Sequence, residues 1–153
     1  MVSIFDVAKR IVNKKIVIEQ WALMEICYYV QAWHYTWTGE RLIKEDFQAW
    51  SKGAVCPELY VWLLQKPIWI SNRDFADMHD DVKWRRGERG SIDIVVKGYR
   101  QLDSKALRDK VRSERPWQVA RGNLPPNAES TVVITLESMG EYYSGLIGEC
   151  SNG

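Results

Sequence analysis

The sequence predicts a mainly α-helical fold, a compact bundle of five to six helices around one central buried helix, with room for one short β-hairpin. Apolar residues recur at intervals of three and four in most segments, which is the spacing of one helix face. Residues 18–37 are apolar on nearly every side, as is typical of a helix buried in a bundle. The length is that of one domain, so residues 1–153 are expected to fold as a single unit.

The first helix is expected to begin after Ser3, whose side chain can cap it, with Asp6 three positions later. The central helix follows over residues 18–37, and Gly39 is placed to end it in the left-handed conformation. One face of that helix has the 3, 4, 3, 4 spacing of a core stripe, formed by Ala22, Leu23, Ile26, Cys27, Val30, Trp33, His34 and Trp37.

Two shorter elements are expected next. Residues 47–50 alternate and predict a short strand, which the turn at 51–53 would fold back into a hairpin. Pro57 stands at the first position of another helix, which Pro67 ends. The core face of this helix is predicted to consist of Leu59, Tyr60, Leu63 and Leu64.

The second half of the chain predicts a loop, three further helices and one short turn of helix. Residues 71–90 are polar and are expected to form the loop, after which Ser91 would cap a helix. Asp103 or Ser104 opens the next helix, and Pro116 starts a short one. Residues 122–130 read as a loop, and Thr135 is placed to cap the last helix.

Composition excludes several classes of protein. Cys27, Cys56 and Cys150 are too few and too widely spaced for a disulfide framework or a metal site, so reduced thiols and no metal or cofactor are expected. We find no signal-peptide pattern and no apolar run of about 18 residues. The sequence therefore predicts a cytoplasmic protein that makes no use of a membrane.

Catalysis is not expected, because no pair of groups suited to proton transfer or nucleophilic attack can be recognised. His34 falls on the buried face of the central helix, where a histidine is usually a hydrogen-bonded core residue. His79 lies in a polar acidic stretch that reads as a solvated loop. The known motifs for acyl transfer, metalloproteases and phosphate binding are absent from the sequence.

Three sequence motifs occur in a characteristic order. They are Tyr-Tyr-Val-Gln-Ala-Trp-His at 28–34, Phe-Gln-Ala-Trp at 47–50 with Gly-Ala-Val-Cys-Pro-Glu-Leu-Tyr at 53–60, and Pro-Trp-Gln-Val-Ala-Arg at 116–121, followed by Ile134 and Tyr142-Tyr143. In this order they resemble the Panacea domain, the phage-associated family of GepA and of the antitoxin SocA, over nearly the whole chain. The resemblance implies a scaffold made by Tyr28, Tyr29, Gln31, Trp33, His34, Trp50, Gly53, Pro57, Glu58, Tyr60, Pro116 and Trp117.

The function that this resemblance implies is protein binding. Members of the family resemble the antitoxin half of toxin–antitoxin pairs, often encoded by phages or prophages, and they neutralise toxins by direct contact or deliver them to a protease. Some expected positions differ, since residues 22–26 read Ala-Leu-Met-Glu-Ile where the family commonly has Lys-Leu-Gln-Lys-Leu. We therefore expect this chain to share the family's fold, whereas the differences leave the identity of its toxin open.

Tryptophan and basic residues suggest where a partner would bind. Trp62, Trp69 and Trp84 fall outside the apolar stripes, and exposed tryptophans are typical of binding hot spots. Residues 83–121 have net charge +7, although the whole chain has only +1. The basic candidates are a loop cluster and a stripe on one helix, formed by Arg85, Arg86 and Arg89 and by Lys105, Arg108 and Arg112.

The basic segment leaves three interpretations open. It forms a solvated face, or steers an acidic protein partner, or tracks the phosphates of a nucleic acid. The favoured function is accordingly an antitoxin with a protein partner, either a cognate toxin or a host factor. The alternatives are a DNA-binding regulator of its own operon and a phage-encoded inhibitor of a host defence enzyme. The oligomeric state is not predicted.

Overall fold

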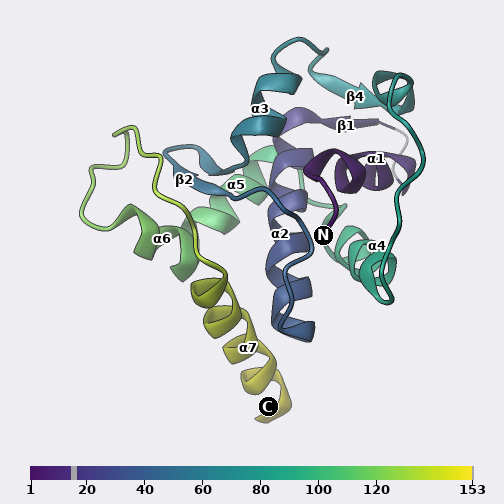
Figure 1. The fold of residues 1–153 in the computed structure, drawn as a ribbon. Helices are drawn as coiled ribbons and strands as arrows, with labels where there is room; N and C mark the ends of the chain where they lie inside the picture. The colour runs from purple at the N-terminus through teal and green to yellow at the C-terminus, as the bar shows by residue number, and fades with distance from the viewer. Residues whose placement is uncertain (15–16, 153) are drawn as a thin grey trace.

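The computed structural model describes residues 1–14 and 17–152 of the chain. Within that range the fold is mainly helical, with two small antiparallel sheets (Figure 1). The elements are, in order, α1 (Ile4–Lys14), β1 (Val17–Glu19), α2 (Gln20–Thr38), β2 (Gln48–Trp50), β3 (Gly53–Val55), α3 (Pro57–Leu63), β4 (Trp69–Ser71), the 3-10 turn η1 (Asn72–Phe75), α4 (Glu88–Tyr99), α5 (Ser104–Ser113), α6 (Arg115–Arg121) and α7 (Leu136–Asn152).

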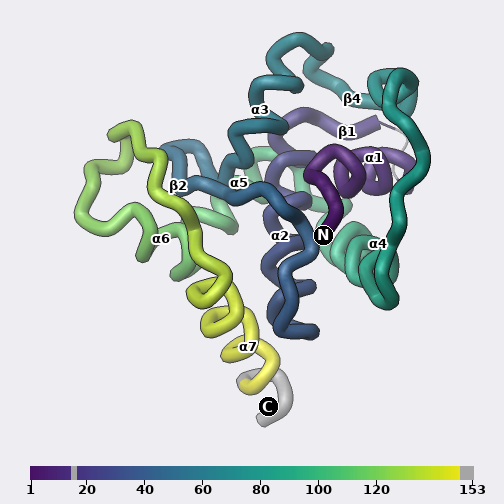
Figure 2. Tube along the Cα trace, viewed as in Figure 1, coloured from purple at the N-terminus to yellow at the C-terminus, as the bar shows by residue number. Residues whose placement is uncertain are grey.

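Helix α2 is the centre of the fold, as the sequence predicted. It packs against α7, α5, α4 and α1, and the trace in Figure 2 shows α7 on one side of it and α4 on the other. Residues 22–32 of α2 are all buried, because neighbours cover every side of the helix. The Glu19 carboxylate accepts from the amide of Trp21 at 3.1 Å, and Gly39 ends the helix in the left-handed conformation with φ 74°.

The ends of the central helix differ from the prediction. Ile18 belongs to β1, which pairs with β4 in a small sheet that the sequence did not reveal. Trp37, expected on the core face, has 42% of its surface exposed because it lies in the last turn of α2. The predicted loop at 71–90 likewise begins with the last residue of β4 and the turn η1.

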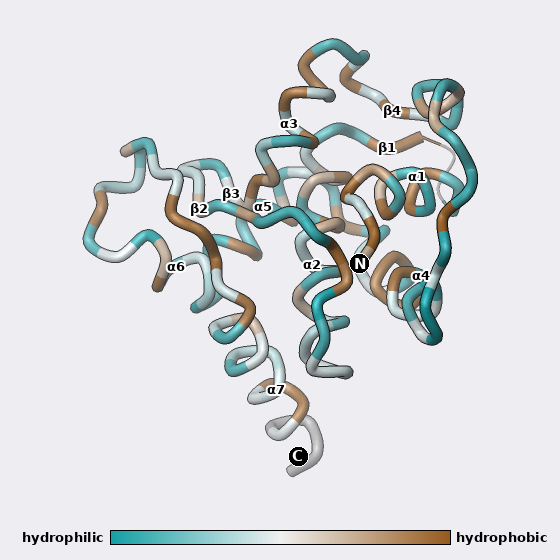
Figure 3. Tube along the Cα trace, in the orientation of Figure 1, coloured by the Kyte–Doolittle hydropathy of each residue, from teal (hydrophilic) through white to brown (hydrophobic). Residues whose placement is uncertain are grey.

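The predicted hairpin is confirmed, and a third segment, residues 129–134, extends it; we call it the returning segment. In the hairpin β2 pairs with β3, so that Gln48 lies opposite Val55. On the other side of β2, the amide of Ala49 donates to the carbonyl of Val132, and the amide of Ile134 donates to the carbonyl of Phe47, both at 2.8 Å. Figure 3 shows the apolar run of this returning segment where it passes β2.

Most of the predicted helix starts are confirmed. Ser3 and Asp6 cap α1 through reciprocal hydrogen bonds, Asp103 caps α5, and Thr135 accepts from the amide of Ser138 in α7. Two further predictions were wrong. Helix α4 begins at Glu88, so Ser91 lies inside it. Leu64 is 65% exposed instead of lying in the core, because α3 ends one residue earlier.

Three further features bear on function. No helix in the described part of the chain is both long and apolar enough to cross a membrane. Among the described residues, no cluster of histidine, cysteine and acidic side chains is arranged to hold a metal ion. Cys27 and Cys56 are buried free thiols, while Cys150 lies outside the residues whose side chains are described.

Candidate functional site

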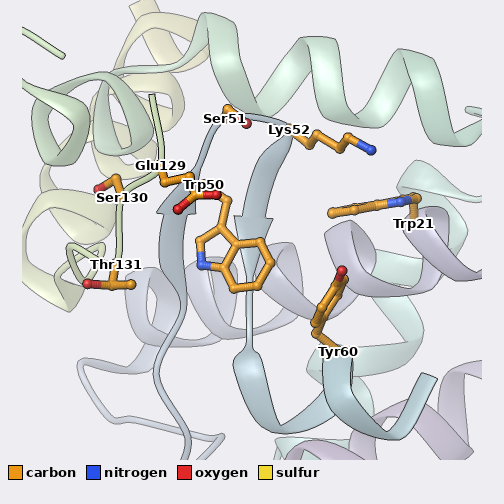
Figure 4. Close-up of a pocket in the computed structure, with 8 residues that line it drawn as sticks. All are labelled: Trp21, Trp50, Ser51, Lys52, Tyr60, Glu129, Ser130 and Thr131. Atoms are coloured by element: carbon orange, nitrogen blue, oxygen red, sulfur yellow. The ribbon is translucent and has the colours of Figure 1, made fainter. Parts of the chain in front are cut away.

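An aromatic pocket lies at the β2–β3 hairpin, and the signature residues Trp50 and Tyr60 line it (Figure 4). Its volume is about 360 Å³, which is within the usual range for ligand pockets. We call it the aromatic pocket and define it by its lining residues, which are Trp21, Trp50, Ser51, Lys52, Tyr60, Glu129, Ser130 and Thr131. Helices α2 and α3, the hairpin and the returning segment each contribute one wall.

Three half-buried rings form the apolar part of the pocket. Trp50 and Tyr60 meet edge to face, with their ring centroids 4.8 Å apart. The centroid of Trp21 lies 6.4 Å from that of Tyr60. In Figure 4 the three rings face a common space instead of stacking on one another. Such a space can receive a bulky apolar side chain, because each ring contributes both area and a defined orientation.

Polar groups stand around the rings. The Lys52 ammonium lies 5.9 Å from the centroid of Trp21, and the Arg108 guanidinium lies 5.5 Å from it. Within the described part of the chain, neither cation forms an ion pair. Figure 4 shows the Tyr60 hydroxyl directed toward Trp21, and Glu129 on the opposite rim. The pocket thus combines an apolar floor with hydrogen-bonding groups at its edge.

Two side chains of α6 hold the walls of the pocket in place. The indole N–H of Trp117 donates to the carbonyl of Trp50 at 2.9 Å. Arg121 is buried and donates to the carbonyls of Ala49, Pro125 and Ala128, which ties the loop before the returning segment to β2. A pocket wall held by such bonds needs little reordering when a partner binds.

A buried carboxylate supports the hairpin from below. Glu25 on α2 is fully buried, and its Oε1 accepts from the amide of Ala54 at 2.8 Å. Its Oε2 has no hydrogen-bond partner among the described residues. Burial raises the pKa of Glu25 well above its ordinary value, although the Ala54 amide and the charges of Arg108 and Arg112 oppose the shift. Gly53 is required here, since a Cβ on it would lie 2.2 Å from that same Oε1.

The paired tyrosines of the first motif lie in the core. Tyr29 donates to Oε1 of Glu114 at 2.6 Å, and Tyr143 donates to the same oxygen at 2.8 Å. The hydroxyls of Tyr28 and Tyr143 lie 3.2 Å apart. Burial raises the pKa of Glu114 and of all three tyrosines, so the tyrosines stay protonated donors at neutral pH. This network joins α2, α7 and the start of α6.

Other residues of the first motif also make internal contacts. The Gln31 amide donates to the carbonyl of Ile43 at 2.9 Å and accepts from its amide at 2.8 Å, which holds the segment after α2 against the helix. His34 is hydrogen-bonded to Ser91 at 2.8 Å, and burial lowers the pKa of this histidine. The indole N–H of Trp33 donates to the hydroxyl of Tyr99.

The remaining signature residues lie on or near the hairpin. Pro57 opens α3, and Glu58 is exposed in its first turn. Pro116 is buried at the start of α6.

The three tryptophans singled out from the sequence have different environments. Trp69 is 62% exposed on β4. Trp62 is half-buried and packs against Phe75, with 4.9 Å between the ring centroids. Trp84 is half-buried against the core. Of these three, Trp69 alone presents most of its surface to a partner.

The basic residues separate into two groups. Arg85, Arg86 and Arg89 are exposed around the start of α4. On α5, Lys105 and Arg112 both bond to Asp109, and Arg108 lies over Trp21. Lys105 and Arg112 are therefore partly neutralised by an acid of their own helix, and Arg108 is the member of the α5 stripe that lies beside the aromatic pocket.

Sequence reasoning missed several residues that shape the pocket. Lys52 reads as an ordinary turn residue, and Glu129 and Thr131 lie in a predicted loop or just after it. Trp21 belongs to none of the three sequence motifs and does not lie on the predicted core stripe of the central helix. One feature of the sequence did point to this region, which is the acidic residue Glu25 within an otherwise apolar helix. A lone acid at such a position needs a buried hydrogen-bond partner.

Comparison with known families gives one match. A family profile described as "Antitoxin SocA-like, Panacea domain" matches residues 23–118. The matched range includes the first two motifs and Pro116 and Trp117 of the third, but it does not extend to the tyrosines of α7, so it is narrower than the resemblance expected from the sequence. Neither the curated proteins nor the solved structures compared with the chain gave a match.

Proposed function

The chain belongs to the family of antitoxin SocA-like, Panacea-domain proteins, and on this premise we propose that it binds one toxin protein and neutralises it by direct contact. The observation that supports direct contact is the aromatic pocket, because two residues of the matched range, Trp50 and Tyr60, direct their rings into it. The signature residues of α2, by contrast, form hydrogen bonds within the chain and do not face a partner.

The contacts divide the molecule into a scaffold and a recognition surface. The buried tyrosine network and Gln31 stabilise the scaffold, and the pocket on the hairpin receives the toxin. The exposed Trp69 and the arginines around the start of α4 are further candidates for contact. Catalysis plays no part in this proposal, since neutralisation by binding requires no bond to break.

A growth assay tests the proposal. Each open reading frame that flanks this one in its native genome is placed under an inducible promoter, with and without this chain on a second plasmid. We expect one neighbour to arrest growth alone and to permit growth with this chain. If no neighbour is toxic, or if toxicity is unaffected, the antitoxin proposal is wrong. Repeating the rescue in a strain without the main cytoplasmic proteases separates direct neutralisation from delivery to a protease.

A DNA-binding role is a second candidate, which the basic cluster around the start of α4 favours. Lys83, Arg85, Arg86 and Arg89 are all exposed, and in the described part of the chain none of them forms an ion pair. Gel-shift titration against the DNA upstream of the gene, at two salt concentrations, tests it. Binding that weakens with salt and with Arg85→Glu/Arg86→Glu supports this role. The absence of a gel shift at micromolar protein would contradict the DNA-binding role.

A further inference from the structure

A second cavity lies beside the aromatic pocket on the hairpin, and we call the two cavities together the groove. The second cavity has a volume of about 490 Å³ and is lined by Lys44, Glu45, Asp46, Gln48, Pro57, Glu58 and Val133. Gln48 lines this cavity, whereas Trp50 lines the aromatic pocket. Alternate residues of a strand point to the same side, so the two cavities lie end to end on one face of β2. The hydrogen bond from Trp50 to Gln48, 2.8 Å long, joins them.

The returning segment repeats this alternation on the other side of the groove. Val133 lines the second cavity, and Thr131 lines the aromatic pocket. Val133 pairs with Gln48 in an antiparallel bridge, which places Thr131 beside Trp50. The groove is therefore bounded by α3 and by the returning segment, and its two cavities are one strand repeat apart, roughly 7 Å.

The two ends of the groove carry different charges. Three carboxylates and one lysine line the second cavity. One of the carboxylates, Asp46, is paired with Arg41, and Glu58 is exposed and accepts a hydrogen bond from the Cys56 thiol at 3.2 Å. At the aromatic end, Lys52 and Arg108 lie over Trp21, and one carboxylate, Glu129, lines the pocket. A partner segment is therefore attracted when its positive group lies at the second cavity. In the opposite orientation that positive group would lie beside Lys52 and Arg108, and the like charges would repel.

From this arrangement we propose that the groove binds an extended segment of a protein partner, with a bulky apolar side chain in the aromatic pocket and a basic side chain two residues away against Glu58. The alternation of an extended chain matches the spacing of the two cavities. The proposal rests on the proposed function, since it specifies how the partner of an antitoxin is recognised. It assigns affinity to the aromatic pocket and orientation to the acidic cavity.

Short peptides test this recognition without any toxin. The probe is Ac-Gly-Phe-Gly-Arg-Gly-NH2, titrated against the isotope-labelled full chain while the NMR signals of the tryptophan indole N–H groups are followed. We expect saturable shifts at Trp50 and Trp21 with a dissociation constant of about 1 mM, a weak value typical of a short flexible ligand. Replacing the probe's Phe by Ala, or its Arg by Glu, should weaken binding about tenfold.

A charge reversal gives the sharper test. Glu58→Lys should bind the Glu-containing peptide better than the Arg-containing one, reversing the wild-type preference. The matched control is Glu137→Lys, which reverses an exposed acid in the first turn of α7 that lines neither cavity, and it should leave both affinities unchanged. In both variants, unchanged indole N–H signals from the tryptophans outside the groove establish that the chain remains folded.

The possible outcomes separate the two proposals. Shifts confined to the groove with the predicted preference support it, even if no flanking gene proves toxic. No saturable shift at peptide concentrations of about 10 mM, or equal affinity for the Arg and Glu peptides, overturns it and leaves the growth assay to decide the antitoxin function. Tighter binding of a nucleoside monophosphate than of the peptide would also overturn it, because stacking of a base would then explain the aromatic pocket.

Discussion

At the scale of single residues, Glu25 is the least ordinary group in the molecule. It is a fully buried acid on the central helix, and one of its oxygens has no partner among the described residues. Its other oxygen holds the hairpin that carries the aromatic pocket. Burial of a charge costs far more than burial of a neutral acid, so the group stays protonated well above its ordinary pKa.

This protonation predicts how stability depends on pH. Because the folded pKa is raised, the folded state holds a proton that the unfolded state releases, and the contribution of Glu25 to stability falls as pH rises above about 4.5. Glu25→Gln keeps an oxygen for the Ala54 amide but cannot ionise. Its stability relative to wild type should therefore increase with pH, by up to about 1.4 kcal/mol per pH unit. Urea unfolding of both proteins at pH 4.5 and pH 8 measures the difference.

The opposite result is equally informative. If Glu25 were ionised and paired with the charges of Arg108 and Arg112, the Gln variant would lose stability relative to wild type as pH rises. Since all other titrating groups are shared by the two proteins, their effects cancel in the comparison.

Gly53 gives a second prediction at this scale. A Cβ at this position would overlap the buried Glu25 carboxylate, and the φ of +154° is unfavourable for other residues. Gly53→Ala should therefore lower the free energy of unfolding by about 1–3 kcal/mol, as overpacking does in other cores. Gly98→Ala on α4, where a Cβ meets open space, is the control and should be neutral or stabilising by up to about 1 kcal/mol. Equal effects of the two substitutions in thermal melts would contradict the proposed packing.

At the scale of elements, the tyrosines of α2 and α7 share one acceptor. Tyr29 and Tyr143 both donate to Oε1 of Glu114, at the junction of α5 and α6. Each substitution to Phe should cost about 1–2 kcal/mol, since a buried hydrogen bond to an acid is lost. Because the bonds share an oxygen, the double variant should differ from the sum by more than about 0.5 kcal/mol.

Chemical denaturation of the single and double variants measures this coupling. Tyr35→Phe, also on α2, is the control, because the Tyr35 hydroxyl has no hydrogen-bond partner among the described residues and its removal should change little. Strictly additive costs for Tyr29→Phe and Tyr143→Phe would mean that the three helices are not joined through Glu114.

Elements with local signals could be predicted from the sequence, and those with non-local pairing could not. The caps at Ser3, Asp103 and Gly39 act within a few residues, so the motifs alone indicated them. The β1–β4 sheet joins three-residue strands about fifty residues apart, and such strands have no periodicity long enough to recognise. Helix α4 begins earlier than expected because Gly87 takes the cap position in place of Ser91.

At the scale of the whole molecule, the candidate site is an assembly of distant segments. The resemblance identified Trp50 and Tyr60 as signature residues but assigned them to the scaffold. Their exposure to a common cavity depends on Trp21 and Thr131, which other parts of the chain bring to the hairpin. Sequence spacing alone cannot show this convergence, because it depends on hydrogen bonds between distant segments. The Trp117 side chain of α6 and the backbone of the returning segment both bond to β2.

The central claim is that this outer pocket recognises a toxin, and blocking it in the growth assay tests that claim most directly. Thr131→Arg adds a long side chain at an exposed position of the pocket, and Asn123→Arg makes the same change at an exposed position in the preceding loop, outside the pocket. With matched expression and unchanged circular dichroism, we predict that wild type and Asn123→Arg restore growth while Thr131→Arg does not. Full rescue by Thr131→Arg would contradict the account.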